Sequence, residues 1–161
     1  MVPLRTHGHA IGRGTLGPMR TRQLNHSAYQ IQYHIVWSTR YRRKWMKEYV
    51  KKEFASACYA IVKKYPTLYI HSLNTDEDHI HLQIEIPPDL TIAAVVQKLK
   101  IESSKRIKQR FKFVREIYLD GSIWSVGYFV STIGLDEERI KRYIAYQGKK
   151  DSGRTLRLRF S

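Results

Sequence analysis

Residues 79–86 alternate strictly between polar and apolar side chains, and this pattern constrains the fold of the 161-residue chain more than any other. Successive side chains of a strand point to opposite faces, so a period of two predicts a strand with one apolar face. The apolar positions, which we expect in the core, are Ile80, Leu82, Ile84 and Ile86. The polar positions begin with His79 and His81, whose Cα atoms should lie about 7 Å apart on the other face. Both rings can then converge on one metal ion, although two merely solvated histidines are the alternative.

Other periodic segments predict the rest of the fold. The expected strands cover residues 29–37, 68–73, 79–86 and 123–133. The expected helices cover residues 46–65, 91–111 and 136–147. The order β-α-β-β-α-β-α predicts an α+β fold, a ferredoxin-like antiparallel sheet with helices on one face, plus a C-terminal helix.

The two ends of the chain differ from this periodic body. Residues 1–27 are rich in glycine and arginine and hold no acidic residue, which predicts a flexible basic arm without regular structure. Residues 149–161 are again basic and predict a C-terminal tail. We therefore expect one domain over residues 28–148.

Charge and composition narrow the function. Lys and Arg number 29 against 14 Asp and Glu, a net charge of +15 that favours a polyanionic partner, with nucleic acid ahead of an acidic membrane surface. The single cysteine, Cys58, excludes an intramolecular disulfide framework. No apolar run approaches the roughly 20 residues that a membrane span needs, so we expect a cytoplasmic protein without a membrane partner.

Two basic clusters are candidate DNA-binding surfaces. The first surrounds Tyr41 and Trp45, an arrangement that suits unpaired bases, and consists of Arg40, Arg42, Arg43 and Lys44. The second lies on the expected helix 91–111 and includes Lys105, Arg106 and Lys108. A solvated helix face is the ordinary alternative for the second cluster, and the net charge favours contacts to a DNA backbone.

The expected C-terminal helix carries Tyr143 and Gln147 four residues apart. Residues at this spacing share one helix face. On its own, a tyrosine at such a position is also typical of the rim of a hydrophobic core.

Together, these segments resemble a known family, the single-tyrosine HUH transposases, which are the TnpA enzymes of small bacterial and archaeal insertion sequences. The resemblance covers residues 28–148. Its matching blocks are residues 29–37 followed by 40–42, residues 78–82 with the histidine–hydrophobe–histidine signature, residues 123–124 with 127–129, and residues 140–144 with Gln147.

The resemblance implies cleavage and rejoining of single-stranded DNA. Tyr143 would be the nucleophile that forms a 5′-phosphotyrosine intermediate, and His79, His81 and Gln147 would hold one Mg²⁺ or Mn²⁺ ion. Of the other tyrosines nearby, Tyr128 falls in an expected strand, and Tyr146 points elsewhere on the helix. The proton acceptor for Tyr143 stays open between metal-bound water and Lys141.

The resemblance also implies partners. Members of the family bind DNA hairpins at the ends of their element and act as homodimers, with active sites in cis or in trans. Gly134 and Leu135 form a short hinge before the helix, which permits the trans arrangement.

Three alternatives remain at this point. A non-catalytic ferredoxin-like nucleic-acid-binding module explains the charge and the fold but not the four candidate site residues. A replication initiator or a domesticated transposase shares the chemistry, so the residues do not separate it. A structural zinc protein needs further Cys or His ligands, which the sequence does not offer nearby.

Overall fold

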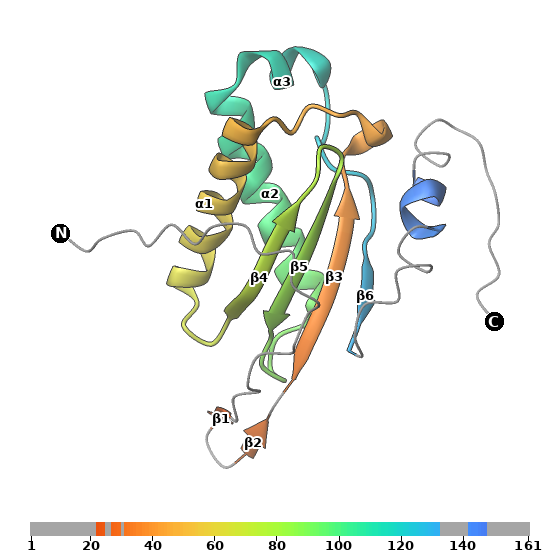
Figure 1. Ribbon diagram of the computed structural model, residues 1–161. Helices are drawn as coiled ribbons and strands as arrows, with labels where there is room; N and C mark the ends of the chain where they lie inside the picture. The colour runs from red at the N-terminus through yellow and green to blue at the C-terminus, as the bar shows by residue number, and fades with distance from the viewer. Residues whose placement is uncertain (1–21, 25–26, 30, 133–141, 148–161) are drawn as a thin grey trace.

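A computed structural model describes residues 22–24, 27–29, 31–132 and 142–147. Its centre is a four-stranded sheet in the order β4-β5-β3-β6 (Figure 1). The strands are β3 Gln32–Ser38, β4 Tyr69–Thr75, β5 His79–Glu85 and β6 Phe129–Ser131. Every neighbouring pair is antiparallel. This order is that of the predicted ferredoxin-like fold, which the structure confirms.

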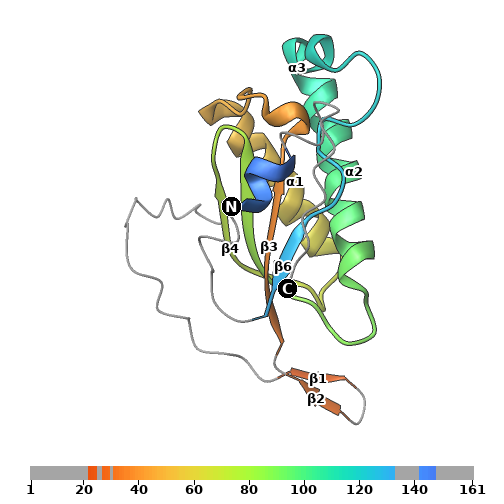
Figure 2. The same cartoon turned by 90° about the vertical axis from the view of Figure 1, so that its right-hand side faces the viewer.

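Two long helices cover one face of the sheet, α1 Glu48–Lys64 and α2 Ile92–Arg110 (Figures 1 and 2). Pro66 follows α1, and the side chain of Thr91 caps α2 by accepting a hydrogen bond from the backbone N–H of Ala94 at 3.1 Å. The apolar positions of β5 predicted for the core are all buried between this sheet face and the helices. The predicted assignment of the two faces of β5 is therefore confirmed.

An aromatic cluster fixes the segment that precedes β6. The ring of Trp124 lies 5.3 Å from that of Phe54 and 6.2 Å from that of Trp37, measured between centroids. Its indole N–H donates to Ser103 Oγ at 3.1 Å, so the buried polar atom is satisfied. Trp45 is also buried and donates to the Tyr118 hydroxyl at 2.9 Å. Trp45 therefore belongs to the core. The expectation that it contacts unpaired bases is wrong, because its ring is not exposed.

The expected strand 123–133 is shorter than predicted. Only Phe129–Ser131 pairs as β6, and a single bridge joins Trp124 to Thr39. Gly127 has a φ of +87°, which breaks the extended conformation, and Lys100 binds backbone carbonyls of this segment that a strand would use for pairing. Residue 133 lies outside the described residues.

One short helix and a pair of short strands were not predicted. A short helix, α3 Lys112–Ile117, follows α2, and its sequence is too rich in charged residues to show a helical period. Strands β1 Arg22–Leu24 and β2 Ser27–Tyr29 form a separate two-stranded sheet, the first of them within the expected arm. Of the expected arm, the structure describes only residues 22–24 and Ser27. The tail 149–161 lies outside the described residues.

The C-terminal helix is described over residues 142–147 only. It lies on the sheet face opposite α1 and α2 (Figures 1 and 2). Tyr143 and Ile144 pack there on Val36 of β3 and on Phe129 of β6, forming a second, small hydrophobic cluster. The polar face of β3 is therefore partly covered rather than solvated. Among the described helices, none is long and apolar enough to cross a membrane.

His34 should make the free energy of unfolding depend on pH. It lies on this second face and is 9% exposed, and burial lowers the pKa of its imidazole. The unfolded chain then binds a proton more readily, so the free energy of unfolding should fall as the pH drops through about 6.5, by at most about 1.4 kcal/mol per pH unit. Urea unfolding from pH 7.5 to 5.5 should show a weaker pH dependence for His34→Gln than for the wild type. Equal pH dependence in both proteins would contradict the assignment.

Candidate active site

The start of β5 places His79 and His81 together on the sheet face opposite the long helices. Their ring centroids lie 5.0 Å apart with an interplanar angle of 72°. The side chain of His79 is 17% exposed, so the pair is accessible but partly enclosed. Two imidazoles at this spacing can share one ion, as their positions in the sequence predicted.

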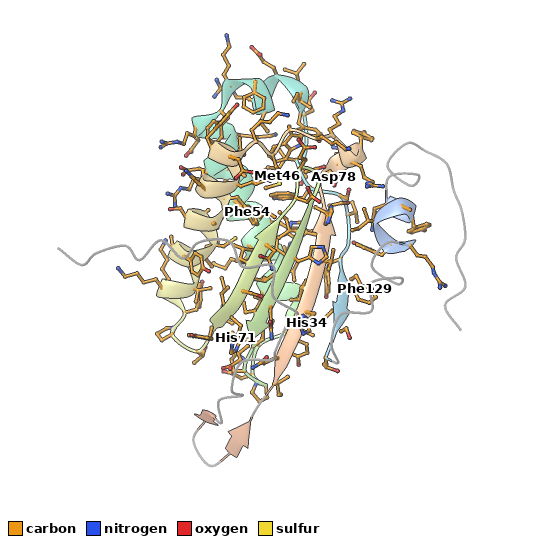
Figure 3. The ribbon with its side chains drawn as sticks, viewed as in Figure 1. His34, Met46, Phe54, His71, Asp78 and Phe129 are labelled. Atoms are coloured by element: carbon orange, nitrogen blue, oxygen red, sulfur yellow. The ribbon has the colours of Figure 1, made fainter. Side chains whose placement is uncertain are left out.

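A buried carboxylate orients the first of these histidines. Asp78 is 5% exposed, and its Oδ1 lies 2.7 Å from His79 Nδ1. This hydrogen bond, with a further contribution from the guanidinium of Arg42, lowers the pKa of the Asp78 carboxyl. The ionised carboxylate accepts a hydrogen bond from Nδ1–H, and in the neutral imidazole the lone pair of Nε2 is then left for a ligand, an arrangement typical of metal-binding histidines. Figure 3 shows Asp78 at the end of the sheet, far from the labelled His71.

Replacing Asp78 with asparagine should weaken activity and metal binding together. Asparagine removes the charge that holds the His79 tautomer, and such outer partners are worth about 10- to 100-fold in metal affinity or activity. Mn²⁺ titration and the rate of the DNA cleavage that the resemblance implies should both report the loss. Asp89→Asn, which changes an exposed aspartate elsewhere, is the matched control. Unchanged Mn²⁺ affinity in Asp78→Asn would contradict the role of Asp78.

Asp76 and Asp78 lie beside the histidine pair and were not among the predicted site residues. The Oδ2 atom of Asp76 lies 3.9 Å from His79 Nε2, on the side of the ring that faces away from Asp78. The signal for both was present, because acidic residues directly precede the histidine pair in the sequence. Carboxylates near histidines are ordinary ligands and outer partners of divalent ions.

Tyr143 and Gln147 form the second half of the site. The Gln147 side-chain N–H₂ donates to the Tyr143 hydroxyl at 3.1 Å and to the backbone carbonyl of Val126 at 2.9 Å. Tyr143 is 8% exposed, and its ring lies 6.1 Å from that of Phe129, which Figure 3 shows beside the C-terminal helix. The predicted sharing of one helix face by Tyr143 and Gln147 is confirmed.

Strand β3 connects the hydrogen-bonded Tyr143 and Gln147, here called the tyrosine–glutamine pair, to the histidine pair. Val36, on which Tyr143 packs, is the register partner of His81, and Ser38 is the register partner of His79. Directly opposed residues of an antiparallel pair have side chains on the same face with Cβ atoms about 4.5–5.5 Å apart. The fold therefore brings the four predicted residues to one face and one end of the sheet, although Tyr143 is more than sixty positions from His81 in the sequence.

The donor set fits one small divalent ion. Among the described residues, the amide Oε1 of Gln147 is buried and has no hydrogen-bond partner. The amide oxygen is a donor that suits Mg²⁺ or Mn²⁺, and neutral imidazole nitrogen is the commonest metal ligand in proteins. The part of the chain that the structure describes holds no group of three or more His, Cys, Asp or Glu placed to bind a metal.

The first basic cluster divides into internal and exposed cations. Arg42 is partly exposed and makes a salt bridge at 3.0 Å with Asp78, the carboxylate that contacts His79. Arg40 and Arg43 lie over the ring of Tyr41 at 5.1 and 5.4 Å, and Arg43 and Lys44 are exposed. Tyr41 and Arg42 have positive φ values of 60° and 51°, a strained backbone that is frequent at functional sites.

The second basic cluster divides in the same way. Arg106 makes an ion pair with Glu53 and donates to Ser56 Oγ at 3.0 Å. Lys108 donates to the carbonyl of Gly121 at 2.6 Å. Lys105 pairs with Glu102 at 3.6 Å, and its side chain is 65% exposed. Of these three, Lys105 is the most available to DNA, and the DNA contacts of all three stay predictions.

Comparison with known proteins assigns the family. Residues 27–147 match the family described as "Transposase IS200 like". The chain is 28% identical over 130 residues to the transposase for insertion sequence element IS200 of Salmonella typhimurium, which covers 81% of this chain and 85% of that protein. It is 24% identical over 138 residues to the ISDra2 transposase TnpA of Deinococcus radiodurans, covering 83% of this chain and 96% of the relative.

A solved crystal structure agrees with the fold. A Deinococcus radiodurans protein described as a transposase superposes with a TM-score of 0.72 at 24% identity, over 78% of this chain and 97% of that one. The chain therefore belongs to the IS200-like transposase family, and its activity is that of a transposase of this family.

Proposed function

We propose that this transposase cleaves and rejoins single-stranded DNA, with Tyr143 as the nucleophile. The observation that carries the proposal is the hydrogen bond from the Gln147 amide to the Tyr143 hydroxyl, on the same sheet face as the histidine pair. A tyrosine, an amide and two imidazoles at one end of a sheet offer a nucleophile and ligands for one cation.

Three residues would hold a divalent ion, Mg²⁺ or Mn²⁺. His79 and His81 supply nitrogen ligands, and Gln147 supplies its unpartnered Oε1. When bound, the ion supplies positive charge that polarises the scissile phosphate. The amide of Gln147 can serve both groups, since its N–H₂ donates to Tyr143 and its oxygen remains for a ligand.

Tyr143 performs the covalent step. The amide N–H of Gln147 stabilises negative charge on the phenol oxygen, which favours the phenolate that attacks phosphorus. A bond forms between the Tyr143 oxygen and phosphorus, and the bond from phosphorus to the 3′ oxygen breaks. The products are a 5′-phosphotyrosine and, after protonation, a free 3′-hydroxyl. Attack by a 3′-hydroxyl reverses the step and restores a phosphodiester, so no nucleotide cofactor is consumed.

The exposed cations would hold the DNA backbone. With a net charge of +15, the chain offers Arg43, Lys44 and Lys105 on its surface, and we propose that the DNA carries a hairpin near each cleaved end. We also propose a homodimer, whose active sites form either in cis or in trans.

Covalent trapping tests the function. Labelled single-stranded oligonucleotides that tile the DNA flanking the gene are mixed with the protein and Mn²⁺, with a parallel reaction in EDTA, and resolved on a denaturing gel. The proposal expects one strand to give a covalent protein–DNA band that requires the ion. Tight binding of the same strand without any covalent band would instead favour a non-catalytic ferredoxin-like nucleic-acid-binding module.

A further inference from the structure

Residues 125–127 lie between helix α2 and the hydrogen-bonded Tyr143 and Gln147. Their backbone carbonyls bind alternately to a residue of α2 and to Gln147. On one side, Lys100 Nζ donates to the carbonyls of Ser125 at 2.9 Å and Gly127 at 2.5 Å. On the other side, the carbonyl of Val126 accepts a hydrogen bond from Gln147 Nε2 at 2.9 Å. One ammonium group therefore holds the two carbonyls that flank the one used by Gln147.

Gly127 of this segment lies close to both Gln147 and Tyr143. A Cβ atom placed on Gly127 would lie 3.4 Å from Gln147 Nε2 and 3.9 Å from the Tyr143 hydroxyl oxygen. The φ of Gly127 is +87°, a conformation that glycine adopts without strain. A small movement of this backbone therefore reaches the hydroxyl that we propose as the nucleophile.

The start of the segment has further anchors besides Lys100. The N–H of Ser125 donates to the carbonyl of Ser38 at 3.0 Å, and the Ser125 hydroxyl donates to the carbonyl of Thr39 at 2.9 Å. These bonds tie Ser125 to the end of β3, next to the strand that carries His79. The carbonyl of Gly127, at the far end of the segment, is held by Lys100.

We propose that Lys100 is a positioning residue for the nucleophile: its ammonium group fixes the backbone of residues 125–127 and thereby the hydrogen-bonded pair of Tyr143 and Gln147. The inference rests on the proposed function, because it assigns the chemistry to that pair. A lysine suits the role, since its compact ammonium donates up to three hydrogen bonds from one point. The ordinary alternative is that Lys100 is one more cation for the DNA backbone.

A double-mutant cycle separates the two readings. Lys100→Met should slow covalent adduct formation at saturating DNA about 10- to 100-fold, since a displacement near 1 Å can cost that much. Its DNA affinity should match that of Lys63→Met, which removes an exposed lysine on α1. In a Gln147→Ala background the effect of Lys100→Met should vanish, because both changes act on the same arrangement. An equal loss in both backgrounds, or weaker DNA binding at an unchanged rate, would overturn the proposal.

A second measurement does not require activity. The side-chain amide protons of Gln147, assigned by their loss in Gln147→Ala, should be protected from exchange in the wild type and should lose that protection in Lys100→Met. Lys100→Arg, which keeps the charge and donors, should recover part of it, and thermal unfolding should show that both variants are folded. Unaltered protection in a folded Lys100→Met would overturn the inference. A wild type that forms no adduct but shows the exchange change would instead contradict the proposed function and leave Lys100 in its positioning role.

Discussion

Tyr143→Phe should abolish the covalent protein–DNA adduct and reduce strand cleavage by about 10³-fold or more, since no other group replaces an attacking nucleophile. Phenylalanine keeps the ring that packs on Val36 and Phe129 and removes only the hydroxyl that Gln147 contacts. Thermal unfolding should therefore change little, while a denaturing gel with labelled single-stranded DNA and Mn²⁺ shows no retained band.

Two other tyrosines provide matched controls. Tyr128 packs against the main core just before β6, and Tyr146 lies on the same helix as Tyr143 but takes no part in its hydrogen bond with Gln147. Tyr128→Phe and Tyr146→Phe should both keep the adduct. A band that survives in Tyr143→Phe and disappears in Tyr128→Phe would keep the reaction class and overturn the choice of nucleophile.

The double substitution His79→Ala/His81→Ala should have the second largest effect, a loss of cleavage of about 10²-fold or more. It removes two ligands of the proposed divalent ion, and with the ion goes the positive charge that stabilises the phosphate oxygens. Both side chains lie on the sheet face away from the main core, so the fold should tolerate the change. Mn²⁺ titration followed by calorimetry should show that the wild-type site is lost, and added Mn²⁺ should not restore cleavage.

His34→Gln is the control for this variant. It changes a histidine on the same sheet face, outside the pair, and at pH 7.5 it should retain Mn²⁺ binding and cleavage. Retention of full Mn²⁺ affinity by the double alanine variant would show that the ion binds elsewhere and would overturn the assignment of the two ligands.

Periodicity predicted the elements that build the main core. The alternation at residues 79–86 set the two faces of β5 correctly, because a strand buried on one side must place every second residue in the core. The cap at Thr91 and the stop at Pro66 bounded the helices for reasons local to a few residues. The same local rules predicted that Tyr143 and Gln147 share a helix face.

Long-range contacts were beyond that reasoning. The expected strand 123–133 shortens because Lys100, on a helix, takes carbonyls that a strand would use, and no local pattern reports this. The salt bridge between Arg42, a predicted DNA contact, and Asp78 was likewise not predicted. Both outcomes depend on which residues meet in space, and local patterns in the sequence do not reveal those contacts.

The small cluster that holds Tyr143 differs greatly in size from the main core. Among the described residues of the C-terminal helix, Tyr143, Ile144 and Gln147 are buried, and the two apolar ones supply about 3–6 kcal/mol by the usual cost of exposing such side chains. This contribution is at or below the low end of the range of global unfolding free energies of domains, which is about 5–15 kcal/mol. Local unfolding can therefore detach Tyr143 from the sheet while the body of the domain stays folded. The half of the candidate site that carries Tyr143 is therefore its less stable half, whereas the half that carries His79 and His81 lies on a strand of the main core and opens only with that core.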